Sequence, residues 1–473
     1  MTNMISIELA GGLHSGRRLR TVLLVALCCG LASTAQVSAQ MRPVVVDGAT
    51  VFTGNGPPLE HGTVIFQGGK ISAVGAGLDA PFLAEQVKGH GKYVTPGWID
   101  LHSTLGLDGP FGGGMATARS ADAFDRYSTD ELRAAWQQGI TTIYLPARAA
   151  NGIGGQGAVI RLCPRGATED VVLEGAAALC LTLGAHEGVG PIGRVQALEA
   201  LRQQLQAAKD YRESWEDYEE NIKEYEEKLA ERAKKAAEAA PPPAEGDKPK
   251  GAAAEKKKGN KKKAAVEKKE GEQEKIEKPS EPGKDRNVEI LLKVLDGDLR
   301  LRVEAYEPAD IVNALQLAEE FHAALIIEGA GGADLLADRL AEAKVPVVLS
   351  AMPQSLAHDL SRNRTARPEA AAVLQHAGVD VYWGSGVVLP ETAPHLALRV
   401  AQGVGAGYDG DAALEALTGK AARLLGVEDK IGQLRAGLNA DLVIWSDHPL
   451  AAGARVERVY IGGQEVYNAE RNR

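Results

Sequence analysis

The stretch VTPGWIDLHSTLGL, residues 94–107, decides how this chain folds. An apolar run ends in a Pro-Gly turn, and a second short apolar strand follows at once. This strand delivers Asp100 and His102 to its carboxyl end. Polar side chains in that position are typical of a site built on a buried strand of an α/β fold.

On either side of this stretch lie two β-rich segments. Residues 43–93 contain short β-like pieces, VVVDGATVFTG and HGTVIFQGGKISAVG, separated by glycine-rich turns. The segment after residue 430 again contains short β-like pieces, IGQLRAGLNADLVIWS and RVERVYIGGQEVY. Because the two segments flank one central region, we expect them to join in a single composite β domain.

The region between them alternates apolar strands with amphipathic helices. The expected strands are WIDLHSTL, GITTIYL, LRLRVEAY, AALIIEG, VPVVLSA and VDVYWGSG, and the expected helices cover 309–321, 332–343 and about 367–377. A helix opening at STDE has Ser128 and Glu131 at the spacing of a capping box. Repeated βα units predict a parallel sheet with helices outside, and their number favours a closed barrel. The glycine-rich residues 151–162 are interpreted as a tight loop over the barrel mouth.

One insertion does not fit a barrel. Apolar residues spaced by three and four predict a long helix over 195–238. Residues 240–284 are rich in Lys, Glu and Pro, with too few large apolar side chains to offset the entropy of ordering, so we expect no fold there. The predicted organisation is a signal peptide at 1–39, sheet domain at 40–95, barrel at 96–207, helical arm and charged linker at 208–286, barrel at 287–429 and sheet domain at 430–473.

Length and composition narrow the class of protein. The 473 residues with 44% apolar content can build a large globular core, and a formal net charge of -10 gives no general attraction for nucleic acid or anionic lipid. After the N-terminal segment, no stretch approaches twenty apolar residues without charge, so we expect a chain that does not span a membrane. Nucleic-acid-binding proteins and membrane channels are therefore disfavoured.

The N-terminus is typical of a secretory signal. Arg17, Arg18 and Arg20 precede the apolar run TVLLVALCCGLA, and Val37-Ser38-Ala39 offers the small residues of a cleavage site. These features predict export to a periplasmic or extracellular compartment. Cleavage after Ala39 would leave Cys163 and Cys180 as two free buried thiols or as one disulfide.

The stretch 94–107, the β segment before it and the ending ALEALTGKAARLLGVEDKIGQLRAGLNADLVIWSDHPL together resemble the amidohydrolase superfamily, closest to its imidazolonepropionase-like branch. The resemblance covers most of the chain apart from the 208–286 insertion. It implies an α/β fold with a distorted TIM (β/α)8 barrel and a composite β-sandwich made from both chain ends. It also implies hydrolysis of carbon-nitrogen bonds other than peptide bonds, with one or two divalent metals.

The metal positions implied by the resemblance have mostly changed. The family's His-x-His pair corresponds to His102 and Thr104, and its fifth-strand His corresponds to Glu304. Its sixth-strand His corresponds to Gly329 after Glu328, and its eighth-strand Asp to Gly386 after Ser385. A metal-bound water needs several such ligands and a nearby carboxylate. The remaining candidate ligands are His102 and Glu304, and the candidate pocket-lining residues are Asp100, Thr104, Glu328 and Ser385.

Two functions in different classes stay open. The first is an exported amidohydrolase with a reduced metal set, holding a single divalent metal that the resemblance implies to be zinc. The second holds no cofactor: it is a catalytically inactive homologue that acts as a binding or partner-stabilising module. Either could take a small-molecule ligand, form a homo-oligomer or pair with an active homologue. His186, Glu187, His358 and His395 are interpreted as surface or capping side chains.

Export predicts a processed N-terminus. We expect the mature protein to begin near residue 40, because signal peptidase cleaves after small residues such as Val37 and Ala39. N-terminal sequencing of protein recovered from its native host checks this. A mature chain that begins at Met1 would contradict the prediction.

Overall fold

The computed structural model describes residues 42–107, 114–149, 152–164, 168–184, 191–238, 277–350, 367–386 and 396–471. The predicted signal peptide and most of the lysine-rich linker lie outside these residues. So do His186, Glu187, His358 and His395. Within the described part, no helix is long and apolar enough to cross a membrane.

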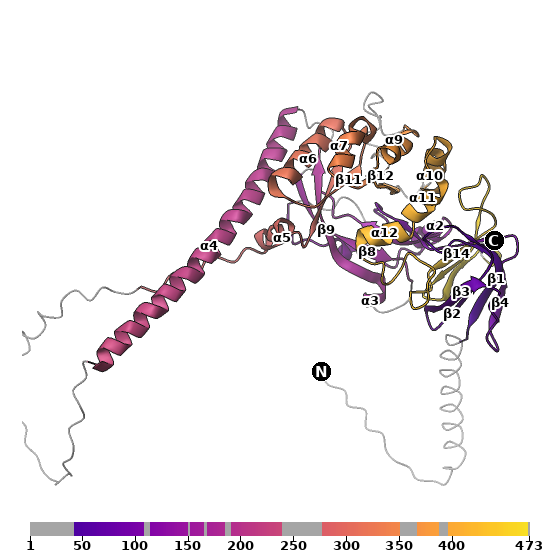
Figure 1. The fold of residues 1–473 in the computed structure, drawn as a ribbon, viewed down its shortest axis with the longest axis horizontal. Helices are drawn as coiled ribbons and strands as arrows, with labels where there is room; N and C mark the ends of the chain where they lie inside the picture. Colours follow the sequence, from indigo (N-terminus) through magenta and orange to yellow (C-terminus); the bar gives the residue numbers. More distant parts are fainter. Residues whose placement is uncertain are drawn as a thin grey trace, which may run out of the picture. The chain divides into compact units, whose positions relative to one another are not determined.

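The two chain ends form one composite sheet, as predicted. Its strand order is β16-β15-β14-β5-β1-β2-β3, with β4 paired to β1. In Figure 1 the indigo N-terminal strands accordingly lie beside the yellow strand β14. The strands are β1 (Val44–Val51), β2 (Leu59–Gln67), β3 (Lys70–Ala76), β4 (Glu85–Lys88), β5 (Tyr93–Pro96), β14 (Leu442–Trp445), β15 (Val456–Ile461) and β16 (Gln464–Asn468).

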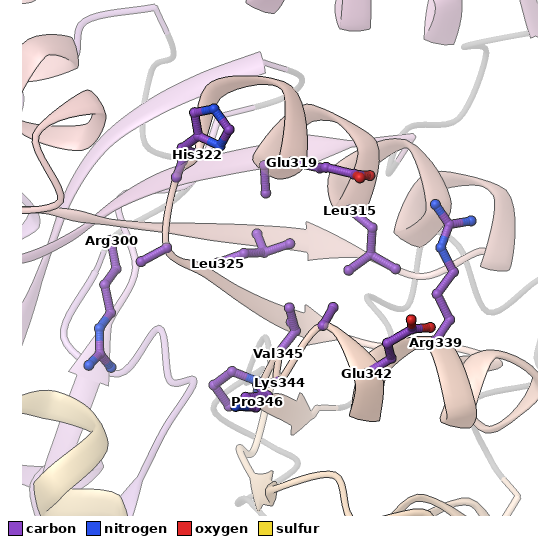
Figure 2. Close-up of a pocket in the computed structure, with 14 residues that line it drawn as sticks. Arg300, Leu315, Glu319, His322, Leu325, Arg339, Glu342, Lys344, Val345 and Pro346 are labelled. Carbon is purple, nitrogen blue, oxygen red and sulfur yellow. The ribbon is translucent and has the colours of Figure 1, made fainter.

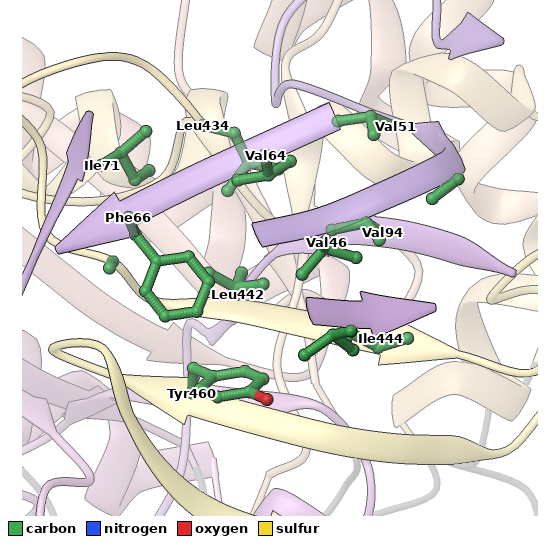
Figure 3. Packing of buried hydrophobic residues seen from close by; sticks show 13 residues of the cluster. Val46, Val51, Val64, Phe66, Ile71, Val94, Leu434, Leu442, Ile444 and Tyr460 are labelled. Carbon is green, nitrogen blue, oxygen red and sulfur yellow. The ribbon is translucent and has the colours of Figure 1, made fainter. Parts of the chain in front are cut away.

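Apolar side chains from both chain ends share the core of this domain. Figure 3 shows Val46, Val64 and Phe66 packed against Leu442 and Tyr460. The Phe66 and Tyr460 rings meet edge to face with centroids 5.1 Å apart. Because neither end buries its apolar face alone, the sheet requires both ends of the chain.

The second sheet is a nearly closed eight-stranded barrel, ordered from β6 to β13 along the chain. A bridge between Ser103 and Gly386, with a 2.9 Å bond from Gly386 N to His102 O, brings the first and last strands together. The strands are β6 (Trp98–Asp100), β7 (Ile140–Leu145), β8 (Gly152–Arg161), β9 (Val172–Leu183), β10 (Arg300–Ala305), β11 (Leu325–Gly329), β12 (Val347–Leu349) and β13 (Val381–Trp383).

Strand β8 corrects the prediction of a loop over 151–162. It runs antiparallel to both β7 and β9, whereas the other neighbouring pairs of the barrel are parallel. Its glycines suggested a turn, but almost every residue of the strand is buried against its neighbours. The barrel is therefore distorted at this point.

Helices follow most barrel strands, and their bounds largely match the expected ones. They are η1 (Ser120–Ala123), α2 (Thr129–Trp136), α3 (Thr168–Val171), α4 (Pro191–Glu238), α5 (Arg286–Leu295), α6 (Pro308–Phe321), η2 (Ala333–Leu336), α7 (Ala337–Glu342), α9 (Ala370–His376), α10 (Leu396–Gly405), α11 (Gly410–Ala416) and α12 (Gly419–Leu425). The helix expected over 332–343 is divided into the 3₁₀ turn η2 and the short helix α7.

The capping box expected at Ser128 does not form. Ser128 is the N-cap residue of α2, but its side chain makes no cap hydrogen bond. Glu131 instead accepts a 2.7 Å hydrogen bond from Gly106 N. Glu131 therefore holds the last residues of the stretch 94–107 in place at Gly106.

A buried ion pair joins the barrel to the composite sheet. Arg161, at the end of β8, donates through Nε to Asp441 Oδ2 at 2.7 Å and through Nη2 to Asp441 Oδ1. Asp441 Oδ1 also accepts from Gly462 N at 2.7 Å. Both side chains are almost fully buried.

This pair predicts a large loss of stability on Asp441→Ala. Removing one partner of a buried pair leaves an uncompensated charge and typically costs about 3–5 kcal/mol. The matched control is Asp122→Ala, which breaks the exposed pair with Arg119 and should cost less than about 1 kcal/mol. Urea unfolding followed by circular dichroism measures both, and equal shifts in the two variants would contradict the prediction.

Candidate functional site

The sequence-predicted residues gather at the carboxyl ends of the barrel strands. Asp100 ends β6 and His102 follows it, while Glu304 and Glu328 lie side by side in register near the ends of β10 and β11. Ser385 follows β13. All five are buried. Thr104 lies close by in the chain and is partly exposed.

Asp100 holds two strand ends together. Its Oδ1 accepts a 2.8 Å hydrogen bond from Ser385 N and a 3.1 Å hydrogen bond from His102 N. Burial raises the pKa of Asp100, against the hydrogen bonds from Ser385 and His102 that lower it. Gly384 permits this closure, because an added Cβ there would lie 2.5 Å from His102 Cβ. The turn that follows β13 thus packs closely against the residues that follow β6.

Arg302 is the central charge of the barrel interior, and sequence patterns did not single it out. It is fully buried. Its Nε donates to Glu328 Oε2 at 2.5 Å, its Nη2 donates to Leu101 O, and its guanidinium carbon lies 3.6 Å from the centre of the Tyr144 ring. The sequence feature that points to Arg302 is the alternating pattern LRLRVEA, because it places Arg302 and Glu304 on the same face of β10.

Glu328 lies between Arg302 and His102. The Nδ1 atom of His102 is 3.1 Å from Glu328 Oε2, the oxygen that also accepts from Arg302. Burial acts to raise the pKa of Glu328, but Arg302 and then His102 outweigh it and hold this pKa at about 2. Glu328 is therefore ionised at neutral pH. The ring of His102 thus faces Glu328, whereas its backbone N donates to Asp100.

Glu304 belongs to a second buried cluster. Arg148 donates to both of its carboxylate oxygens, at 2.7 and 2.6 Å, and Tyr306 Oη donates to Oε1 at 2.9 Å. Burial acts to lower the pKa of Arg148, but Glu304 raises it above its usual value. Both oxygens of Glu304 are thus engaged by a bidentate guanidinium, the strong form of a charge-assisted hydrogen bond.

Cys163 and Cys180, the two cysteines among the described residues, are buried thiols not joined by a disulfide. Cys180 Sγ lies 3.2 Å from Tyr144 Oη. Burial raises the pKa of the Cys180 thiol to about 11. Because the thiolate is the nucleophile, Cys180 is not suited to covalent catalysis at neutral pH.

The described residues at the carboxyl ends of the barrel strands do not fit a divalent metal. Among the described residues, no group of three or more His, Cys, Asp or Glu side chains is placed to hold a metal ion. Glu304 is already engaged by Arg148, and Glu328 by Arg302. Gly329, where a sixth-strand His would stand, has a φ of 77°, and an added Cβ would lie 2.8 Å from the Tyr306 ring. Arginine and tyrosine side chains thus occupy the space, and engage the carboxylates, that a metal and its ligands would need.

A separate hollow of about 670 Å³ lies away from these residues. Figure 2 shows Leu315 and Glu319 of α6 facing Arg339 and Glu342 of α7 across it. Arg300 and Leu325, which begin β10 and β11, also line it. It therefore lies at the opposite strand ends from Glu304 and Glu328.

The fold has counterparts among solved structures. An amidohydrolase from Thermotoga maritima MSB8 superposes with a TM-score of 0.67 at 25% identity, covering 90% of this chain and 100% of the other. The structure of an uncharacterised protein superposes with a TM-score of 0.51 at 17% identity, covering 90% of this chain and 100% of the other.

Sequence relatives are matched over short segments. The amidohydrolase family profile matches residues 403–467. The amidohydrolase tasK of Hapsidospora irregularis is 33% identical over 102 residues, 21% of this chain and 10% of that protein. An imidazolonepropionase of Aeromonas hydrophila is 39% identical over 89 residues, 18% of this chain and 21% of that protein. The matched segments thus span about a tenth and a fifth of these relatives.

The depressed pKa of Glu328 predicts a pH-dependent contribution to stability. The pKa of Glu328 is about 2 in the fold and 4.5 in an unperturbed carboxyl group, so the contribution is complete above about pH 5 and is lost as the pH falls toward 2. We expect Glu328→Gln to destabilise the protein by about 3 kcal/mol at pH 7, and the difference from the natural chain to narrow at acidic pH. Urea unfolding from pH 7 down to pH 3 measures it.

The control is the double variant Arg302→Met with Glu328→Gln. Because it removes both charges, we expect it to be less destabilised than the sum of the two single changes. A Glu328→Gln difference that is constant across the pH range, or strict additivity in the double variant, would show that the ion pair does not stabilise the barrel.

Proposed function

Since the chain belongs to the amidohydrolase superfamily, with relatives in its imidazolonepropionase-like branch, we propose that it is a catalytically inactive member that binds a small polar ligand at the barrel mouth. The proposal rests on the residues that lie where the family resemblance implies metal ligands. A family resemblance gives the scaffold, whereas chemistry must be argued from the site.

The observation that carries the proposal is the buried Arg302. Its guanidinium supplies the positive charge that balances Glu328, and it does so through fixed hydrogen bonds and stacking on Tyr144. A catalytic metal also supplies positive charge, but it keeps an open position for water or substrate. A guanidinium has no such position, so it supports ligand binding more readily than activation of water.

Hydrolysis by a rearranged metal set is the second candidate. His102 Nε2 and Asp100 Oδ2 are buried and have no hydrogen-bond partner among the described residues. Buried polar atoms without partners are costly, and a ligand or an ion would satisfy them. The substrate would then be a cyclic amide or imide, as the family resemblance implies.

Export and partners are further proposals. The composition of residues 1–39 supports secretion, with action in a periplasmic or extracellular compartment. An inactive barrel would serve there as a binding protein or as the stabilising partner of an active homologue.

Elemental analysis distinguishes the two functions. We expect protein purified without chelators to contain far less than one metal per chain, because Arg148 engages both carboxylate oxygens of Glu304 and leaves His102 as the single remaining candidate ligand. We also expect no acceleration of lactam, imide or acyl-dipeptide hydrolysis with added zinc, manganese or cobalt. Near one metal per chain, with activity lost in His102→Ala, would establish the rearranged hydrolase instead.

A further inference from the structure

The inserted unit, residues 203–292, presents three aromatic rings on one face of α4. Tyr211, Trp215 and Tyr218 are four and three residues apart, so they lie on one side of the helix. The ring centroids of Tyr211 and Trp215 are 6.2 Å apart, and those of Trp215 and Tyr218 are 5.9 Å apart. Both pairs meet edge to face.

A small hollow of about 300 Å³ lies beside these rings. Its walls come from α4 and from the first part of α5. Three of its residues carry carboxylates and one carries a guanidinium: the lining comprises Tyr211, Arg212, Trp215, Glu216, Glu219, Glu289 and Leu292. Aromatic faces with several carboxylates match the chemistry of an ammonium group, which is attracted by both.

A cation already lies over one of the rings. Lys284 Nζ is 5.9 Å from the centre of the Trp215 ring and 3.5 Å from Glu281. The surrounding helix adds to this preference, because residues 213–227 carry eight acidic side chains and one basic side chain. A surface with that charge concentrates cations around the rings.

We propose that this pocket, defined by Trp215, Glu216, Glu219 and Glu289, binds ammonium groups of the chain's own lysine tract KKKGNKKK at residues 256–263. The tract has the charge that complements the helix. It is also close along the chain, since it lies between the end of α4 at Glu238 and Lys284. The inference does not depend on the proposed function of the barrel.

Chain length permits the contact. Trp215 lies 23 residues before Glu238, which is about 35 Å along a helix at 1.5 Å per residue. The 18 residues from Glu238 to Lys256 can span up to about 60 Å when extended. A second copy of α4 fits less well, because pairing two 213–227 segments would bring like charges together.

Carbodiimide cross-linking of the full chain at low salt tests the proposal. This reagent joins lysine ammonium groups to carboxylates in direct contact, and mass spectrometry locates the joined peptides. We expect cross-links from residues 256–263 to Glu216, Glu219 or Glu289, lost at high salt because exposed ion pairs are screened. Cross-links spread evenly along α4, including Glu226 and Glu227, would overturn the pocket.

Matched variants distinguish binding in the pocket from general attraction of lysines to the acidic helix. Glu216→Gln with Glu219→Gln should reduce the cross-linked fraction about three- to tenfold, whereas Glu226→Gln with Glu227→Gln, which removes the same charge from the same helix, should leave it nearly unchanged. Circular dichroism confirms that each variant keeps its helix. Equal losses in both variants would overturn the proposal.

A mixture of isotopically labelled and unlabelled chains identifies the source of the lysines. Cross-links within one chain are expected. Cross-links mainly between labelled and unlabelled chains would overturn the intramolecular contact. A peptide of residues 254–265, titrated into a chain whose six tract lysines are changed to Gln, should quench Trp215 fluorescence, and no response relative to Trp215→Phe would also overturn the proposal.

Discussion

The buried pair of Arg302 and Glu328 is the constraint on which the barrel interior depends. A charge transferred from water to the interior costs several kcal/mol even after relaxation, so each group must be paired and hydrogen-bonded. Arg302 meets this need through Glu328, the Leu101 carbonyl and the Tyr144 ring. These partners belong to β11, to the segment after β6 and to β7, so the pair connects several strands that are distant in the sequence.

Arginine and a metal ion can both neutralise buried carboxylates, but they do so in different ways. Carboxylates at the ends of β10 and β11 need positive charge, which Arg148 and Arg302 supply. A guanidinium binds carboxylates through planar, fixed donors, and it is effectively never deprotonated. A site balanced in this way keeps its charge over the physiological pH range. The glycines at 329 and 384 belong to the same arrangement, because larger residues would collide with Tyr306 and His102.

Sequence patterns predicted the composite sheet, the barrel and the long helix α4, because each depends on periodic burial of apolar residues. These patterns gave wrong predictions where the composition of a segment indicates a turn but the fold buries that segment. Strand β8 was interpreted as a loop because its glycines favour turns, although here it is buried on both sides. The site was found only in part: Asp100, His102 and Glu328 do meet, but the pairing of Arg302 with Glu328 and of Arg148 with Glu304 follows from distances between strands that no local pattern contains. The pairing of Ser128 with Glu131 failed because Gly106 N is available to Glu131 in the fold.

The stretch 94–107 connects both domains to this interior. Strand β5 belongs to the composite sheet and β6 to the barrel, with Gly97 between them, and Gly97 N donates to Asp441 O at 2.9 Å. The carboxylate of Asp441 in turn binds Arg161 of β8, and Trp98 packs against Trp445 with ring centroids 4.7 Å apart. Packed, hydrogen-bonded elements of this kind transmit displacements with little loss. The position of His102 in the barrel is therefore fixed from two directions, by Glu328 within the interior and by the composite sheet through the strand that precedes it.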